Sequence, residues 1–488
     1  MSEGPASAPV GPRGDSWRWF VAGLCLIALA LRLLHLRAVA DIVLTIPAEI
    51  GLDRWLQMHI GEAVARGDWL GGWSAGYDTG PLYGYGLALP YRACGERWIC
   101  PVTLQAILGA LGPALAFGIG QALYCRAVGI LAAILTCLYT PAIFYELLLV
   151  KFALLPIAVA TLLFCIARAR ASGAARWIVP SGLLLGVLAA LRANGLLVLP
   201  VAILWMIGPV RGAWPRLRVL LLACAGVALV LAPITLRDAV ASRRGLGTSL
   251  WGIHFYIGTN PDADGTYAPV DGIRDDVVGH VVDARRIAER LEGRLLTPHE
   301  VSLHWYRKGL EFIRQQPTAY ARLQVAKLRR VFEADEQGSF GDDFHDHQVV
   351  SRVLRLPLLS FGVIGPLGIL GLLLTLLRGR PALLPLFTLT YVVSLLPFFV
   401  TARYRLPLVP PLLVLTAEAL CWMEQALRER RGWALAGAAG LVALVALAVE
   451  PNPRELVALS CLTALGLWLA RAVKLAALRA DASGKSYR

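Results

Sequence analysis

The chain has 488 residues, of which 57% are hydrophobic and only 16% are charged, and its mean hydropathy is +0.61. Soluble domains carry closer to a quarter charged residues, so this composition excludes an ordinary soluble protein. The formal net charge of +14 comes largely from Arg clusters at the ends of apolar runs, a pattern that orients membrane proteins. We therefore expect no nucleic-acid partner.

Apolar runs of about 20 residues, long enough to cross a bilayer, recur along the chain. Hydropathy and the Lys/Arg rule place about twelve spans, near residues 19–40, 102–123, 129–144, 152–168, 177–191, 195–209, 217–236, 356–377, 382–400, 405–424, 432–449 and 454–472. The N-terminus (1–18) and the basic tail (473–488) then lie in the cytoplasm. No small-residue cleavage site follows the first apolar run, so we interpret it as a retained span. The sequence predicts an all-α polytopic membrane protein.

Two parts of the chain lie outside the membrane in this layout. One is a first loop, residues 41–101, and the other is a block, residues 237–355, that holds most of the acidic residues. The spans divide into an N-terminal module (19–236, including the first loop) and a C-terminal set (356–472). We expect the larger external block to be mostly helical.

Helix signals recur in both external parts. The apolar stretch GPLYGYGLALPYRACG (80–95) is too short to span, which favours an interfacial or re-entrant helix. In the larger block, Thr297 and Glu300 form a capping-box pattern. Apolar residues then recur at helical spacing: Leu303, Tyr306, Leu310 and Ile313. Pro317 begins a second helix that reaches about Glu333.

Ionisable side chains at membrane depth are costly, and each is a candidate for function. A small set lies on the predicted outer side: Asp53, in a surface helix at the outer interface, and at the outer ends of spans Glu146, Lys151, Arg192, Arg403 and Arg405. Most are cations, on the side that the Lys/Arg rule leaves poor in them. Arg192 and Asn194 also interrupt GLLLGVLAALRANGLLVLP, which is bounded by cytoplasmic loops, so the chain must turn outside there.

The functional interpretation of these cations is a pocket for an anion. Arg and Lys would bind a phosphate on a lipid tail, and the tail would lie between helices. The alternative is that the cations pair with Asp53 and Glu146 and only tie helices together. Arg32 and Arg37 also go against the Lys/Arg rule, and we attribute them to snorkelling. The outer cations taken together favour the pocket.

The order of several motifs resembles a known family. An acidic first loop ending in GDW is followed by GPLYGYGLAL, RAVGILAAI, a Tyr-rich turn before Lys, LRANGLLVLP, FYIGTNPDADGTY, WYRKGLEFIRQQP and RYRLPLVP. From about residue 20 to residue 425, this order resembles bacterial GT-C membrane glycosyltransferases of the dolichyl-phosphate-mannose protein mannosyltransferase and aminoarabinose transferase type. Relatives commonly show Arg-Pro-Asn where this chain has Arg-Ala-Asn (192–194), and Asn-Asn-Pro where it has Thr-Asn-Pro (259–261).

The resemblance implies a GT-C fold, a polyprenyl-phosphate-sugar donor and transfer on the periplasmic face of a bacterial inner membrane. The family's catalytic Asp falls on Asp53, with Asp78 as the rival carboxylate and Asp68 as a structural residue. Other active-site positions of the family fall on Tyr145, Glu146, Lys151 and Arg192. The acceptor, a protein, a lipid or a glycan, is not determined.

The chemistry suggested by the residues agrees with this resemblance. A carboxylate at the membrane edge, Asp53, suits a general base that takes the proton of the attacking hydroxyl. Fixed cations suit the charge that grows on the departing phosphate: Lys151, Arg192, Arg403 and Arg405. Direct attack by the acceptor would invert the anomeric centre.

The stretch NPDADGTYAPVD (260–271) has the oxygen spacing of a calcium loop. An EF-hand loop has a helix on each side and a bidentate Glu at its last position. This stretch ends in Asp271, and the sequence on either side of it predicts extended structure. A tight turn built by Asn, Asp and Gly fits better, and the resemblance implies that it lies over the active site. Four of its residues are active-site candidates: Asn260, Asp262, Asp264 and Tyr267. A divalent cation shared by Asp262, Asp264 and the donor phosphate stays open.

Two further patterns suggest local chemistry. GDDFHDH (341–347) carries His345 and His347, and His-x-His beside Asp can bind a transition metal, although such acidic loops are usually only solvated. Cys94 and Cys100 bracket a polar stretch in a loop that faces an oxidising compartment, where a disulfide is plausible.

Two other classes of function remain open. A transporter or flippase for an anionic lipid-linked substrate should show broken helices in matching halves, but only one such break is found, at Arg192. A non-catalytic scaffold would not need outer cations near carboxylates. We therefore expect a glycosyltransferase.

Overall fold

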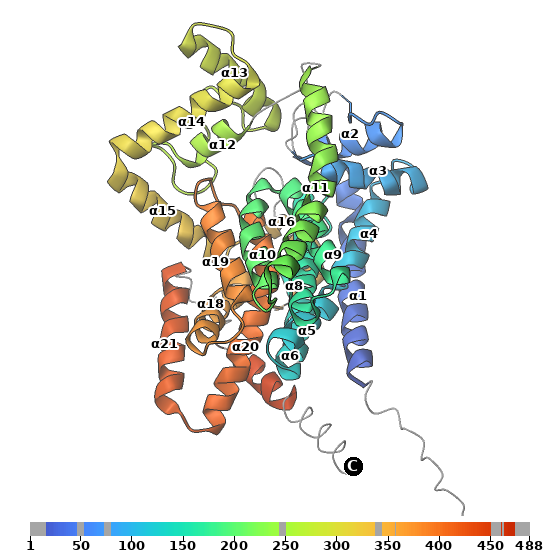
Figure 1. Ribbon diagram of the computed structural model, residues 1–488, viewed down its shortest axis with the longest axis vertical. Coiled ribbons are helices and arrows are strands. Elements are labelled where there is room, and N and C mark those ends of the chain that lie inside the picture. Colours follow the sequence, from blue (N-terminus) through green and yellow to red (C-terminus); the bar gives the residue numbers. More distant parts are fainter. Residues whose placement is uncertain are drawn as a thin grey trace, which may run out of the picture.

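The computed structural model describes residues 16–45, 53–72, 80–243, 250–336, 344–356, 358–449, 460 and 463–473. Within these residues the secondary structure is helical, apart from one isolated bridge between Tyr139 and Leu359. A bundle of apolar helices carries a smaller helical block above its upper end (Figure 1). Asp78 lies outside the described residues.

Within the described residues, six helical stretches are long and apolar enough to cross a membrane; one is interrupted by a turn and two begin as 3₁₀ helix. They are α1 (Ser16–Thr45), α4 with α5 (Ile99–Gly109 and Gly112–Leu123), η2 with α8 (Lys151–Leu154 and Leu155–Ser172), α11 (Ala213–Arg243), η4 with α20 (Ala402–Leu408 and Val409–Arg428) and α21 (Gly432–Val449). The chain is a multi-pass membrane protein.

Shorter apolar helices fall within the remaining predicted spans. They are α6 (Arg126–Cys137), α9 (Ala175–Leu191), η3 with α10 (Ala193–Leu197 and Val198–Ile207), α18 (Phe361–Leu377), α19 (Leu383–Leu395) and a helix over Thr463–Val473. The total of twelve spans and their orientation remain predictions.

Two of the shorter predicted spans stop being α-helix before their predicted ends. The span at 129–144 is wrong as one helix, because α6 ends at Cys137 and α7 (Thr140–Tyr145) starts after the extended residue Tyr139. There the backbone pairs with a distant segment, since Thr140 N donates to Leu359 O at 3.0 Å. The span at 382–400 ends as a helix at Leu395, and residues 396–400 continue as a non-helical segment.

Small residues let the bundle helices approach closely, as is common between helices in membranes. A Cβ on Gly371 of α18 would lie 1.9 Å from Leu415 O of α20, and one on Gly182 of α9 would lie 2.3 Å from Ala223 O of α11. These close contacts fix the helices whose outer ends carry the site.

The first external loop forms a helical pair, α2 (Asp53–Ala65) and α3 (Leu82–Cys94), beside the upper end of α1 (Figure 1). The pair is tightly packed, because a Cβ on Gly84 would lie 2.5 Å from the Ile60 side chain. A disulfide joins Cys94 to Cys100 at the end of α3. The pair places Asp53, the first residue of α2, at the upper end of the bundle.

The larger external block consists of α12 (Trp251–Gly258), α13 (Val277–Glu292), α14 (Pro298–Gln315) and α15 (Pro317–Phe332). The capping box at Thr297 and Glu300 is confirmed, as is the second helix from Pro317. The segment before NPDADGTYAPVD is helix α12, so the expected extended flank is wrong. Helices α16 (Phe344–Val350) and α17 (Arg352–Arg355) contact α1 and α7.

The buried face of α14 differs from the apolar pattern read in the sequence. The buried residues of the helix are Val301, Ser302, His304, Trp305, Gly309 and Phe312. Leu303 and Tyr306 are 36% and 41% exposed. Trp305 anchors the block instead, with its indole N–H donating to Ala284 O at 3.1 Å.

Candidate active site

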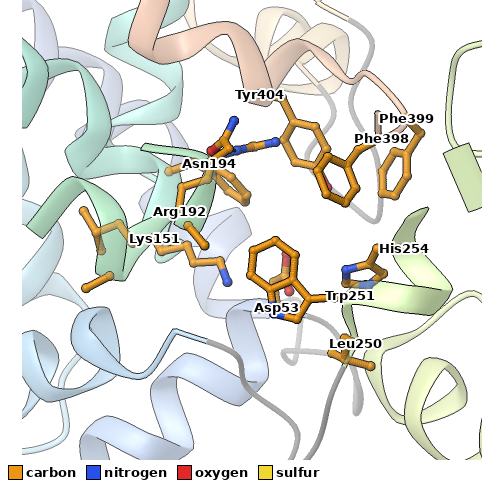
Figure 2. Close-up of a pocket in the computed structure, with 14 residues that line it drawn as sticks. Asp53, Lys151, Arg192, Asn194, Leu250, Trp251, His254, Phe398, Phe399 and Tyr404 are labelled. Carbon is orange, nitrogen blue, oxygen red and sulfur yellow. Dashed lines mark hydrogen bonds between the residues drawn. The ribbon is translucent and has the colours of Figure 1, made fainter. Parts of the chain in front are cut away.

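A cavity of about 150 Å³ lies where the bundle, the first loop and the external block meet. Figure 2 shows the side chains that surround it. Its lining is Asp53, Lys151, Phe152, Ala190, Leu191, Arg192, Ala193, Asn194, Leu250, Trp251, His254, Phe398, Phe399 and Tyr404. Segments up to 351 residues apart in the sequence, from Asp53 to Tyr404, therefore converge on one small volume.

Asp53 supplies the carboxylate of the cavity. It is the first residue of α2, and its Oδ2 lies 3.2 Å from a terminal guanidinium nitrogen of Arg403. Burial alone would raise the pKa of Asp53, but the positive charges of Arg403 and Lys151 outweigh it and hold the pKa below its usual value. Since 28% of its side chain is exposed, the ionised carboxylate is accessible from the cavity.

Arg192 enters the cavity because the chain breaks between α9 and η3. Its backbone is extended, with φ −155° and ψ 108°, and this directs the side chain across the Tyr404 ring, 3.8 Å from its centre. Arg192 Nε donates to Asn194 Oδ1 at 3.2 Å, and the Asn194 amide donates to Ser394 Oγ at 2.9 Å. Nη1 of Arg192 is buried and has no hydrogen-bond acceptor among the described residues.

Lys151 and Arg403 add two further cations. Lys151 begins η2 and lines the cavity, and Figure 2 shows its amine directed toward the Asp53 side. Arg403 belongs to η4, is 5% exposed and lies over the Phe152 ring at 4.9 Å. Asp53 therefore pairs with Arg403 and shares the cavity with Lys151 and Arg192, a charge surplus that suits an anionic ligand.

Several cavity residues were missed by the reasoning from sequence: Trp251, His254, Phe398, Phe399 and Tyr404. His254 comes from α12, where burial and the neighbouring His280 lower its pKa to about 3, so the imidazole is neutral. Its ring is a polar group among aromatic walls. Two features of the sequence pointed toward them. Tyr404 lies between two arginines that were predicted site residues, and α12 directly precedes the predicted turn.

Arg405 does not reach this cavity. It is 1% exposed, pairs with Glu336 at 2.7 Å and donates to the backbone carbonyls of Glu333 and Asp335. Tyr145 belongs to the same cluster, since its hydroxyl donates to Glu336 Oε2 at 3.3 Å. These contacts attach the end of α15 to the bundle.

Glu146 also lies elsewhere. Its Oε2 is 2.5 Å from Nε of Arg32, and both side chains are almost fully buried. The snorkelling assigned to Arg32 is therefore wrong, because this guanidinium is held inside the bundle by a carboxylate 114 residues away. Arg37, by contrast, is exposed.

The stretch NPDADGTYAPVD forms a tight turn outside the cavity lining. Asn260 Oδ1 accepts from the Asp262 backbone, and Asp264 Oδ1 accepts from the backbone and hydroxyl of Thr266. Tyr267 donates to Asp275 at 3.1 Å and lies 2.9 Å from His280 Nε2. The oxygen atoms that gave the appearance of a calcium loop thus shape the turn itself.

No metal cluster is found among the described residues, in the sense of three or more His, Cys, Asp or Glu side chains grouped to hold an ion. His345 lies 3.0 Å from Asp335 Oδ1, whereas His347 stacks near His35 and Phe144. The two histidines of GDDFHDH therefore face different neighbours.

No family model and no curated protein matches the sequence. Among solved structures, the chain is similar to the archaeal oligosaccharyltransferase AglB from Archaeoglobus fulgidus in complex with an inhibitory peptide and a dolichol-phosphate (TM-score 0.46, 13% identity, 92% of this chain and 56% of that chain covered). It is also similar to the apo form of that enzyme (TM-score 0.48, 14% identity, 94% and 56% covered). A further similar structure is ArnT from Cupriavidus metallidurans bound to undecaprenyl phosphate (TM-score 0.37, 14% identity, 84% and 79% covered). The chain thus spans little more than half the length of the oligosaccharyltransferase.

Proposed function

We propose that this chain is a membrane glycosyltransferase that moves a sugar from a polyprenyl-phosphate donor to an acceptor on the periplasmic face of a bacterial inner membrane. The observation that carries the proposal is that Asp53 pairs with Arg403 and shares one cavity with Lys151 and Arg192. Glycosyl transfer from a lipid phosphate needs a base and an anion site close together. The motif order resembling GT-C enzymes supports the same function.

In the proposed reaction, an acceptor hydroxyl attacks the anomeric carbon while the bond from that carbon to the phosphate oxygen breaks. The hydroxyl proton passes to Asp53, and the electron pair of the broken bond stays on the phosphate. The phosphate is stabilised by Lys151 and by the unsatisfied Nη1 of Arg192. A single displacement of this kind inverts the anomeric centre.

The lipid tail of the donor has an apolar path beside the anion site. Leu196 and Leu197 directly follow Arg192 and Asn194 and are 42% and 53% exposed. Both side chains are exposed on the outside of the helices, at the outer end of the bundle. An isoprenoid chain would contact them there while the phosphate contacts Arg192.

The deciding experiment supplies the purified protein in proteoliposomes with a panel of labelled polyprenyl-phosphate sugars and candidate acceptors. Release of polyprenyl phosphate together with labelled acceptor would support the transferase. Movement of the labelled lipid across the bilayer without release would contradict it and support a transporter or flippase instead.

Replacing Arg192 with Met is expected to raise the KM for the donor by about 10- to 100-fold, the range for losing one hydrogen bond to a charged group. Arg170, in the last turn of α8 and outside the cavity lining, offers a matched control. Its guanidinium lies 4.2 Å from the Trp205 ring centre and donates to Trp205 O at 2.7 Å. Arg170→Met should leave the donor KM unchanged. An equal rise in both variants would exclude a specific contact between Arg192 and the donor.

Replacing Arg403 with Met is expected to move the acid limb of the pH–rate profile to higher pH. Arg403 is the charge that lowers the pKa of Asp53 most, so the pKa rises without it. The base is active when ionised, and the rate falls as the pH drops through that pKa. Measuring kcat/KM for transfer from about pH 4 to pH 8 tests this. An unchanged acid limb would show that Asp53 is not the titrating base.

A further inference from the structure

One wall of the cavity is a short non-helical segment, residues 396–400, between α19 and η4. It carries Phe398 and Phe399, which Figure 2 shows on the side of the cavity facing Trp251 and His254. Phe398 and Trp251 form an edge-to-face pair with ring centres 6.1 Å apart. We call residues 396–400 the wall segment. A non-helical segment lacks the regular internal hydrogen bonds of a helix, so its position depends on contacts from elsewhere.

The external block supplies those contacts. Thr259 Oγ1 donates to Pro397 O at 3.1 Å, and Val400 N donates to Gly265 O at 2.9 Å. The third is the amine of Lys327, which donates to Leu396 O at 2.7 Å. The backbones also touch, because a Cβ on Gly258 would lie 2.4 Å from Phe399 N. Three elements of the block therefore hold five residues of the bundle.

Lys327 is the unusual member of this set. It lies in the middle of α15 and is 0% exposed, whereas lysines are almost never fully buried unless they are paired. Among the described residues, the Lys327 amine donates to a backbone carbonyl. Burial lowers the pKa of this amine to about 7. An apolar side chain would fill the same space without this cost. Unlike an apolar side chain, the lysine also donates a hydrogen bond to the wall segment.

We propose that Lys327 is a positioning residue that fixes the wall segment, and with it Phe398 and Phe399, against the cavity containing Asp53. The external block is then part of the site as well as a surface above it. The role of this cavity in sugar transfer rests on the proposed function, but the link from Lys327 to the wall segment does not.

The first test measures the position of the wall segment without any activity. Phe398→Cys is introduced into a parent in which the exposed Cys125 and Cys224 are replaced by Ser, and labelling by a charged thiol reagent is timed. Lys327→Met leaves the buried Leu396 carbonyl unpaired, so labelling is expected to become about tenfold faster. Lys327→Gln, which keeps an N–H donor, is expected to label more slowly than Lys327→Met.

Tyr124→Phe is the matched control, because it removes one partly buried hydrogen bond, 3.1 Å to Thr375, between residues outside the cavity lining. It should lower the melting temperature without changing the labelling rate. Thr259→Val removes the neighbouring hydrogen bond to Pro397 and should also make labelling faster. This variant keeps the test valid if the Lys327 variants do not fold. Labelling at the parent rate in Lys327→Met, or equal acceleration in the Met and Gln variants, would overturn the proposal.

The second test is kinetic and separates the two proposals. If sugar transfer is found, Lys327→Met should raise the KM for the donor or acceptor about tenfold, with a smaller effect on kcat, since binding depends on the wall and the reacting groups remain. Tyr124→Phe should change neither constant. If no donor supports transfer, the proposed function fails, while the labelling result still decides the role of Lys327.

Discussion

Replacing Asp53 with Asn is expected to reduce sugar transfer by about 10²- to 10⁴-fold, the range typical of a lost general base. The amide keeps the size of the side chain and one acceptor oxygen near Arg403, but it cannot take a proton. The loss should appear in kcat, with the donor KM changed little, because the cations that bind the phosphate remain. The measurement is release of polyprenyl phosphate in proteoliposomes.

Asp68→Asn is the matched control from the same external loop. Asp68 accepts from the backbone N–H groups of Leu70 and Gly72, at 3.1 and 3.0 Å, and is absent from the cavity lining. We expect this variant to transfer sugar at nearly the normal rate. Full activity in Asp53→Asn would remove Asp53 from the chemistry, and Asp78→Asn would then be the variant to measure.

The grouping of the site could be predicted from sequence because one physical rule selects it. Cations on the predicted outer side are unusual under the Lys/Arg rule, and this singled out Lys151, Arg192 and Arg403, up to 252 residues apart. It also selected Arg405, which pairs with Glu336 instead. Spans that share an outer end bring such residues to one level of the membrane. The rule therefore predicts that these residues lie at a similar depth in the membrane. Which of them come into contact depends on how the helices pack.

The partners of buried charges could not be predicted in this way. Glu146 and Arg32 meet because α1 packs beside α7, which ends directly before Glu146, and no local pattern in either segment indicates that contact. Arg403 and Arg405 are two residues apart in one motif, yet the first contacts Asp53 and the second Glu336. Their directions depend on the 3₁₀ turns of η4, which hydropathy does not reveal.

The same limit applies to α14. The capping box and helical spacing correctly predict its start and its type, because both depend on neighbouring residues. Its buried face depends on which other elements exist to cover it. The Trp305 side was covered by α12 and α13, and the Leu303 side remained partly exposed.

Replacing Glu336 with Gln is expected to lower the free energy of unfolding by about 3–5 kcal/mol, the usual effect of removing one partner of a buried ion pair. The side chains of Glu336 and Arg405 are 5% and 2% exposed, so water cannot replace the lost carboxylate charge. Thermal unfolding in detergent gives the measurement. Glu96→Gln, in the exposed pair with Arg66, should change stability little.

This variant also decides the role of Arg405, which the sequence assigned to donor phosphate binding. If Arg405 only attaches the end of α15 to the bundle, Glu336→Gln should cost stability while the donor KM of the folded protein stays close to normal. A stable variant with a changed donor KM would mean that Arg405 acts on the donor and that Glu336 holds it in place. The geometry favours the first result, because Arg405 already bonds two backbone carbonyls and a carboxylate outside the cavity lining, whereas the side chain of Arg192 lines the cavity.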